Sequence, residues 1–319
     1  MKTIIAILWH KSANRLRMIT PYLKDRVNLK IYSAAELGDG REDLDALYRE
    51  MDKADGFLFN VTVSDSVWGE IEEYAAAKTT PIVYVGGEAM SHVKNKESLK
   101  HSAYCNQYYH YSGKENLVNM ILYMVTEVLG ESYGYKTPLF IPWEGIFHPD
   151  TEEVFQSSQD YFASRGKSPK GVIAVIASRT TWLNEDIAVE KELIRIIEAK
   201  GYSALPIYTY SWPDAEIGAK GVEFAVAQFC FDSAGKPVID AMIRMSGFFL
   251  QSNNDGKQSK PSSIMKRLNC PIAKPICSTS MSIEEWEASK DGTIADLPWS
   301  IALPELEGVI EPIFIGAED

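Results

Sequence analysis

Short apolar runs alternate with amphipathic stretches along the first half of the chain. The run at 3–9 (TIIAILW) is continuous in apolar residues, which is typical of a strand buried on both faces of a sheet. Parallel strands require helical crossovers, so the alternation predicts a parallel sheet covered by helices on both sides. The predicted strands are 3–9, 28–33, 56–63 and 81–85, and the predicted helices are a polar stretch ending by residue 26, then 42–51, 66–78 and 115–129.

The second half shows the same alternation without a close sequence repeat of the first. Its buried run at 171–177 (GVIAVIA) precedes a helix for which Asn184 is the expected N-cap. The most loop-like stretch is 252–261 (SNNDGKQSKP), which predicts a flap. The predicted helices are 152–164, the stretch after Asn184, most of 213–231, and 282–288; the predicted strands are 171–177, 202–208, part of 241–251 near 248–250, 271–277 and 312–316.

Together the two patterns predict an α/β protein with two doubly wound, Rossmann/flavodoxin-like parallel-sheet domains. The first domain is predicted at 1–135 and the second at 151–319. Residues 136–150, here called the strap, join them and are rich in proline and aromatic side chains.

The strap contains the sequence PLFIPWEGIFHPD, in which three prolines fix φ and remove backbone donors. It therefore predicts an extended segment. One interpretation is a rigid connector whose aromatic side chains pack into both halves. The other is that the strap, which also contains Trp143 and Glu144, lines a cleft in which His148 faces a ligand.

Composition narrows the classes of partner. The 319-residue chain is 45% hydrophobic and 24% charged, as globular proteins are, and its formal net charge of −12 argues against nucleic acid or an anionic membrane. The four cysteines show no CxxC spacing, which favours reduced thiols over a zinc site or disulfides. No apolar run approaches the roughly 20 residues that span a bilayer. The apolar start at 3–9 is too short for the apolar region of a signal peptide and lacks a small-residue cleavage site, so we expect no signal peptide here. We therefore expect a soluble, cytoplasmic protein.

Polar residues follow the predicted strands of the first half at their carboxyl ends, where open α/β sheets bind ligands. His10, Asn60 and the pair Gly86-Gly87 are expected along this rim. His10 could equally cap the next helix. The glycines do not form a GxGxxG fingerprint and the chain has no P-loop, so any ATP chemistry is expected to belong to another polypeptide.

A second candidate site follows the strand at 171–177. Arg179 offers a fork for carboxylate or phosphate, Trp182 offers a flat stacking face, and the start of the next helix favours anions. The alternative is that Arg179 lies on the surface and Trp182 fills the gap between the domains.

Short motifs spread over nearly the whole chain carry a resemblance to a known family. They are 111–117 (YSGKENL), 145–149 (GIFHP), 171–184 with the following helix, 205–206 (LP), and 286–292 followed by 301–308 (IALPELEG). Together they resemble the large subunit of cobaltochelatase (CobN) and the related magnesium-chelatase H subunit. Two departures are that no serine follows Arg179 and that the chain stops at Asp319, soon after the PELEG motif, whereas family members are several times longer. We therefore expect an amino-terminal portion of such a subunit or a stand-alone relative of it.

The resemblance implies a ligase function, the formation of a metal–nitrogen bond in a tetrapyrrole. It implies that a corrinoid or porphyrin binds, that separate AAA+ subunits hydrolyse ATP, and that cobalt or magnesium is a substrate metal and not a tightly bound cofactor. Within the family, cobalt insertion in cobalamin biosynthesis is favoured over magnesium insertion or removal of a metal from haem. Trp143, Trp182, Arg179, Glu144 and His148 have the side chains that a carboxylated tetrapyrrole requires.

Catalytic residues are not assigned by the sequence, and the chain alone need not catalyse the reaction. Two other function classes remain open. One is a two-domain protein that closes on a small polar ligand without chemistry. The other is a docking scaffold that recruits other subunits through its acidic surface.

Overall fold

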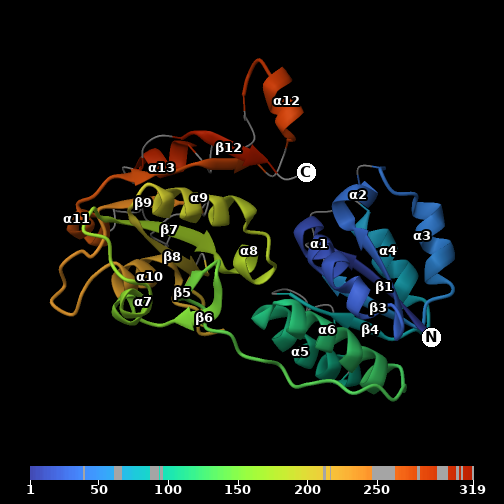
Figure 1. Ribbon diagram of the computed structural model, residues 1–319. Coiled ribbons are helices and arrows are strands. Elements are labelled where there is room, and N and C mark those ends of the chain that lie inside the picture. The colour runs from blue at the N-terminus through green and yellow to red at the C-terminus, as the bar shows by residue number, and fades with distance from the viewer. Residues whose placement is uncertain are drawn as a thin grey trace. The chain divides into compact units, whose positions relative to one another are not determined.

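The computed structural model divides the chain into two units, unit 1 (Met1–Ile141) and unit 2 (Pro142–Asp319), and each is described by itself. Figure 1 shows the helices and strands of both. The division places strap residues 136–141 in unit 1 and 142–150 in unit 2. The residues described are 1–38, 40–60, 67–86, 93, 96–210, 213–215, 217–245, 263–278, 281–292, 301–306, 309 and 312–317.

Unit 1 contains a parallel sheet with strand order β2-β1-β3-β4. The central strand β1 supplies apolar side chains to both faces, because successive side chains of a strand point in opposite directions. Ile4 and Leu8 enter one core, and Ile5 and Ile7 enter the other. The predicted strands are therefore present, as β1 (Lys2–Leu8), β2 (Val27–Ser33), β3 (Gly56–Asn60) and β4 (Ile82–Tyr84).

Helices cover both faces of this sheet. One core contains side chains from α1 (His10–Ile19), α5 (Lys96–Tyr111) and α6 (Lys114–Tyr123). The opposite core contains side chains from α2 (Ala34–Gly38), α3 (Leu44–Met51) and α4 (Trp68–Ala76). The chain also forms a 3-10 turn at Thr20–Tyr22, and a π-helical turn at Met124–Val128 continues α6. The sequence did not predict α5, whose many polar and tyrosine positions obscure its apolar face.

Unit 2 contains a sheet with strand order β10-β9-β7-β8-β5-β6. Four strands run parallel, whereas β5 is antiparallel to both β8 and β6. The parallel strands are β7 (Val172–Ser178), β8 (Ser203–Thr209), β9 (Ala241–Arg244) and β10 (Ile272–Ala273), and the antiparallel pair is β5 (Gly145–His148) with β6 (Thr151–Phe155).

The strand pair β5–β6 differs from the predictions for the strap and for the helix at 152–164. The last part of the strap is a sheet strand, and the predicted helix at 152–164 begins only at α7 (Ser158–Arg165). The Ser157 hydroxyl accepts a hydrogen bond from the Asp160 N–H at 3.1 Å, which caps that helix. Residues before this cap pair with β5 across the turn at Pro149 and Asp150, so they form a strand.

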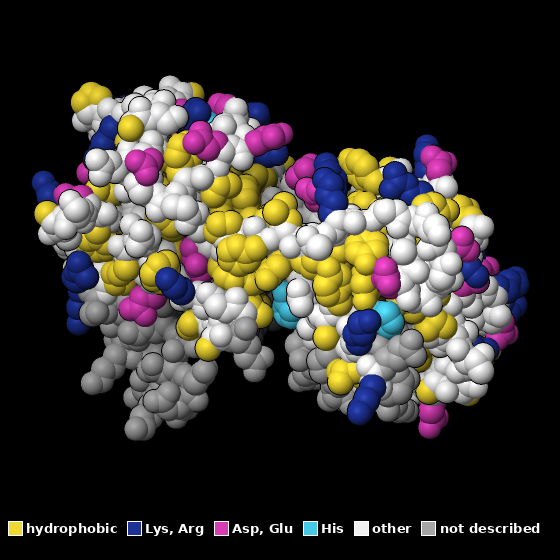
Figure 2. Space-filling model, turned by 90° about the horizontal axis from the view of Figure 1, so that it is seen from below, with side chains coloured by type: hydrophobic (Ala, Val, Ile, Leu, Met, Phe, Trp, Pro, Cys, Tyr) yellow, Lys and Arg dark blue, Asp and Glu magenta, His cyan; other side chains and the backbone are white. Residues whose placement is uncertain are grey.

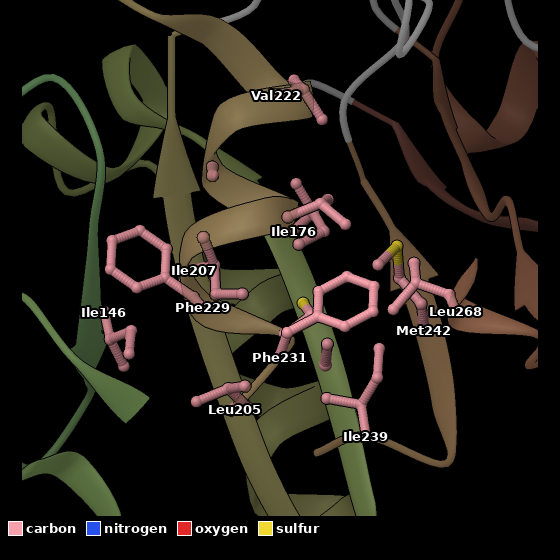
Figure 3. Packing of buried hydrophobic residues seen from close by; sticks show 14 of the residues in the cluster. Ile146, Ile176, Leu205, Ile207, Val222, Phe229, Phe231, Ile239, Met242 and Leu268 are labelled. Atoms are coloured by element: carbon pink, nitrogen blue, oxygen red, sulfur yellow. The ribbon is translucent and has the colours of Figure 1, made fainter. Parts of the chain in front are cut away.

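Helices also cover both faces of the sheet in unit 2. Figure 3 shows side chains of α10 (Gly221–Phe229) and of the sheet meeting in one core, where Val222 and Phe229 lie near Ile176 and Ile207. This core also includes side chains from α7 and α11 (Ser263–Leu268). The other face packs against α8 (Arg179–Leu183) and α9 (Ala188–Ala199).

The expected N-cap at Asn184 is wrong. Asn184 is the C-cap of the short helix α8, and α9 begins four positions later, after Ile187. Glu185 has a positive φ of 61°, which breaks the helix between them. The helix expected over most of 213–231 is shorter, as α10. The strand expected in 241–251 is β9, while its predicted centre at 248–250 and the flap at 252–261 lie outside the described residues.

The last part of unit 2 forms a separate small parallel sheet of β11 (Ile276–Ser278) and β12 (Phe314–Ala317). Helix α12 (Ile283–Ala288) begins with a capping box formed by Ser282 and Glu285, and Trp286 stacks on Phe314 at 4.3 Å between ring centroids. A one-turn helix, α13 (Leu303–Leu306), also occurs here. In the part of the chain that is described, no helix is long and apolar enough to cross a membrane.

Candidate functional site

Unit 2 brings most of the predicted site residues to one edge of its sheet. The carboxyl ends of β7 and β8 lie together because these strands are parallel and in register. Strand β5 is antiparallel and pairs its first residue, Gly145, with Tyr208 near the end of β8. The residues that precede β5, Trp143 and Glu144, therefore lie at the same edge as Arg179. We call Trp143, Glu144, Arg179, Trp182 and Tyr208 the carboxyl-edge cluster.

Arg179 is the charged centre of this cluster. Its side chain is 1% exposed, its Nε donates a hydrogen bond to the Pro142 carbonyl at 3.0 Å, and its guanidinium carbon lies 4.2 Å from the centre of the Trp143 ring. Burial lowers the pKa of Arg179 to about 10, opposed by the nearby Tyr208, Glu144 and Tyr210. Arg179 is therefore buried, and the interpretation that placed it on the surface is wrong.

Trp143 and Glu144 connect the cluster to α10. The Trp143 indole N–H donates to the Ile217 carbonyl at 2.7 Å. Glu144 Oε1 accepts hydrogen bonds from the backbone N–H groups of Lys220 and Gly221, both at 2.9 Å. A carboxylate at this place satisfies donors at the start of a helix and interacts favourably with the helix dipole. Glu144 therefore fastens α10 to the start of β5.

Trp182 and Tyr208 form a stacked pair, with ring centroids 3.9 Å apart and planes inclined by 7°. Trp182 is half-buried, whereas Tyr208 is fully buried. The Tyr208 hydroxyl has no hydrogen-bond partner among the described residues. Its ring lies against Gly145, where an added Cβ would be 2.6 Å from the hydroxyl oxygen. Glycine is required at 145 because any side chain would collide with this ring.

Two further buried cations lie at the carboxyl ends of neighbouring strands, and neither was predicted as a site residue from the sequence. Arg244 is the last residue of β9 and is 1% exposed. Lys274 follows β10, is 3% exposed, and donates hydrogen bonds to the carbonyls of Pro275 at 3.0 Å and Met245 at 3.4 Å. In the sequence, Arg244 and Lys274 each directly follow a short apolar run. A basic residue at the end of a predicted buried strand is therefore the pattern that could have identified them.

His148 does not join the cluster, because it lies at the opposite end of β5. It is 2% exposed, its Nε2 lies 3.1 Å from Glu198 Oε1, and its Nδ1 accepts a hydrogen bond from the Asp150 N–H at 3.2 Å. These contacts assign the ring proton to Nε2, which donates to Glu198. The histidine thus connects the β5–β6 turn to the end of α9.

Asn60 lies in unit 1, where it links the ends of two strands. Its Nδ2 donates to the Val85 carbonyl at 2.7 Å, and its Oδ1 accepts from the Tyr109 hydroxyl at 3.1 Å. The Tyr109 hydroxyl is also 2.7 Å from that of Ser12. His10 begins α1, and its side chain lies outside the described part of the structure. The roles of both residues in ligand binding stay predictions.

Charge is distributed evenly at the visible surface: on the face shown in Figure 2, basic and acidic side chains are interspersed. Among the described residues, no group of three or more His, Cys, Asp and Glu side chains could hold a metal ion. Four buried charged residues of unit 2, Glu144, Arg179, Arg244 and Lys274, instead lie at the carboxyl edge of its sheet.

Comparison with known proteins identifies relatives over most of the chain. The family model for CobN/Magnesium Chelatase matches residues 106–319. An uncharacterized protein of Methanocaldococcus jannaschii is 30% identical over 221 residues, which cover 68% of this chain and 17% of the relative. The chloroplastic magnesium-chelatase subunit ChlH of Oryza sativa subsp. indica is 26% identical over 222 residues, covering 64% of this chain and 15% of the relative.

A fold similar to that of this chain occurs among solved structures. The catalytic subunit of cobaltochelatase from Mycobacterium tuberculosis superposes with a TM-score of 0.62 at 18% sequence identity, covering 100% of this chain and 25% of that one. The matched region is thus a quarter or less of the length of each of these proteins. The similarity confirms the mixed α/β architecture with mainly parallel sheets.

Proposed function

Because the chain belongs to the CobN/magnesium chelatase family, we propose that it contributes to tetrapyrrole binding in a chelatase large subunit that inserts a metal ion. The observation that carries this proposal is the carboxyl-edge cluster of unit 2. It gathers aromatic and cationic side chains where open α/β sheets bind ligands. A tetrapyrrole has a broad aromatic ring and carboxylate substituents, so it needs both kinds of group.

Trp182 and the buried cations have separate tasks in this proposal. Trp182 is half-buried and presents an indole held in place by Tyr208, so it supplies a stacking surface. Arg179, Arg244 and Lys274 attract carboxylates toward the edge of the sheet. Their burial strengthens this attraction, because charges are screened less in a protein interior than in water.

We assign no proton acceptor for the pyrrole nitrogens. Glu144 Oε1 is occupied by two backbone N–H groups of α10, and His148 lies at the other end of β5. The metal is a substrate in this proposal, with cobalt favoured over magnesium. We also propose that separate AAA+ subunits hydrolyse ATP and that the protein is cytoplasmic.

Titration with a metal-free tetrapyrrole bearing free carboxylates tests the proposal. The wild type is expected to shift the Soret band and quench tryptophan fluorescence. Trp182→Leu should weaken binding about tenfold, the equivalent of about 1.4 kcal/mol, a stacking contribution of ordinary size. Trp286→Leu is the matched control, because Trp286 is also half-buried and stacked on one ring. Absence of a Soret shift in the wild type, or equal weakening by both substitutions, would contradict the proposal.

The same titration separates the contributions of ring and carboxylates. A tetrapyrrole whose carboxylates are esterified should bind more weakly than the free acid, and Arg244→Met should reduce that difference. Arg267→Met on α11 is the control, since Arg267 is exposed and lies over Phe231. Tighter binding of a metal-free corrinoid than of a metal-free porphyrin would support cobalt, and the reverse order would support magnesium.

A further inference from the structure

Unit 2 contains a cavity of about 410 Å³ that none of the predicted site residues lines. It lies where the end of α7, the turn after it, the end of α9 and the start of β8 meet. Its lining includes Tyr161, Arg165, Lys167, Ser168, Glu198 and Tyr202. A volume of this size is typical of small-molecule sites. The cavity is at the amino end of β8, so it is distinct from the carboxyl-edge cluster.

The lining is more cationic than the chain as a whole. The charged residues of the lining are two cations, Arg165 and Lys167, and one carboxylate, Glu198, in a protein whose formal net charge is −12. A second carboxylate, Asp150, lies outside the lining but 3.5 Å from Arg165. The turn that supplies the cations, 165–170 (RGKSPK), has three basic residues and no acidic one. Such a local excess of positive charge attracts an anion.

Hydrogen bonds hold the turn in place, whereas the contacts of Arg165 with Asp150 and of Lys167 with Phe162 are long. The Ser168 N–H donates to Ser203 Oγ at 2.8 Å, and the Ser168 hydroxyl donates to the Gly201 carbonyl at 2.6 Å. Arg165 makes a long contact of 3.5 Å with Asp150. The Lys167 ammonium lies 5.4 Å from the centre of the Phe162 ring. Both cations can therefore turn toward a bound anion without loss of a short ion pair.

Glu198 links the cavity to His148. Glu198 Oε1 accepts a hydrogen bond from His148 Nε2 at 3.1 Å, and the Glu198 side chain is 34% exposed. The histidine thus fixes a negative charge in the wall of the cavity, where it opposes an anion. His148, the histidine of the GIFHP motif, therefore influences the charge of the cavity wall through Glu198, although His148 itself is buried.

We propose that this cavity binds a small molecule carrying an oxyanion group, phosphate or carboxylate, through Arg165 and Lys167. Glu198 limits the affinity, and the Tyr202 ring flanks the ligand. The inference does not rest on tetrapyrrole binding, which involves the opposite end of the sheet.

Calorimetric titration of the full chain with inorganic phosphate tests the inference, with sodium chloride at equal ionic strength as reference. Saturable binding is expected in the wild type. Arg165→Met and Lys167→Met should each weaken it at least fivefold, because each removes a cationic contact. Glu198→Gln should tighten it several-fold, because the amide can still accept the His148 proton but carries no charge. Titration with malonate then distinguishes carboxylate from phosphate ligands.

Arg195→Met is the matched control, since Arg195 lies on α9 near Glu198 but is exposed and pairs with Glu192. It should bind phosphate as the wild type does. The inference is overturned if phosphate and malonate produce no more heat than chloride in both the wild type and Glu198→Gln, or if Arg195→Met weakens binding as much as Arg165→Met. Because Trp182 is remote from the cavity, Trp182→Leu should retain phosphate binding even if tetrapyrrole binding is lost.

Discussion

The two units end their parallel strands in different ways. In unit 1 the groups that link the strand ends are neutral: the Asn60 amide connects the Val85 carbonyl to the Tyr109 hydroxyl. In unit 2 the corresponding edge contains buried charges, among them Arg179 and Glu144. The same architecture therefore supports a neutral network in one unit and a charged one in the other.

This difference shows that unit 2, and not unit 1, bears the desolvation cost of buried charges at the edge of its sheet. Neutral amides and hydroxyls lose little when they are buried and paired, whereas a buried ion loses several kcal/mol of hydration. The charges of unit 2 are bonded to backbone groups, Arg179 to the Pro142 carbonyl and Glu144 to N–H groups of α10, which offsets part of that cost. Hydrophobic replacements of buried charges are often at least as stable, so these charges agree with the proposed role of the edge in binding.

The largest expected effects test a feature that both edges share, a glycine under a close side chain. Gly86→Ala should destabilise unit 1 by about 4 kcal/mol, because its Cβ would lie 2.1 Å from Asn60 Nδ2 at a φ of +107°. Gly145→Ala should cost unit 2 about 3 kcal/mol through collision with Tyr208. Hydrogen exchange of peptides from each unit reports which one loosens.

Gly69→Ala provides the control for these glycines. Gly69 lies in α4 with open space around its Cα, so alanine should stabilise the helix by about 0.5–1 kcal/mol. If Gly145→Ala were equally harmless, the close packing of Tyr208 on β5 would be wrong.

A smaller effect distinguishes the neutral edge from the charged one. Asn60→Asp replaces the donor to the Val85 carbonyl by a second acceptor and should destabilise unit 1 by about 2 kcal/mol. Glu144→Gln keeps an oxygen for the two α10 amides and should cost unit 2 less than about 1 kcal/mol. Urea unfolding with exchange measurements on each unit compares the two. Equal costs would mean that charge at Glu144 matters as much as hydrogen-bond geometry does at Asn60.

The smallest effect concerns two tyrosines of unit 2. Tyr161→Phe should cost about 1 kcal/mol because the hydroxyl donates to the Ala204 carbonyl, whereas Tyr208→Phe should be neutral or slightly stabilising because that hydroxyl has no partner among the described residues. Thermal unfolding at pH 7 measures this difference. Destabilisation by Tyr208→Phe beyond that of Tyr161→Phe would contradict it.

Alkaline pH should separate each tyrosine substitution from the wild type. Burial raises the pKa of both hydroxyls above that of an unfolded chain, so the folded state keeps protons that the unfolded state releases. Their contribution is complete below the unfolded value of about 10 and is lost as pH rises above it. Tyr208→Phe should therefore lose less stability than the wild type between about pH 9 and 11.

Sequence patterns predicted most of the strands because parallel strands buried on both faces consist of continuous apolar runs. The runs at 3–9 and 171–177 show this most clearly and became β1 and β7. Short segments were harder: β6 has too few residues to reveal a period, and α5 has an apolar face obscured by tyrosines. Neither Asn184 nor its neighbours signalled that two helices would follow β7.

The candidate site was predicted only in part, because the direction of β5 decides which strap residues meet Arg179. An antiparallel β5 places Trp143 and Glu144 beside Arg179 and sends His148 to the far end of the strand. Sequence alone does not give that direction. Because the side chains of His148 and Arg179 are almost fully buried, substitution of either residue should lower the melting temperature.

The pairing of β5 with β8 also constrains the order in which unit 2 can fold during synthesis. The β5–β6 hairpin leaves the ribosome before β7, α8 and α9, yet its sheet partner is β8, which is synthesised after all three. Until β8 emerges, one side of the nascent hairpin has backbone groups with no native strand to pair with. Vectorial folding of unit 2 must therefore wait for this distant strand, and nascent chains ending before it should be preferred clients of chaperones.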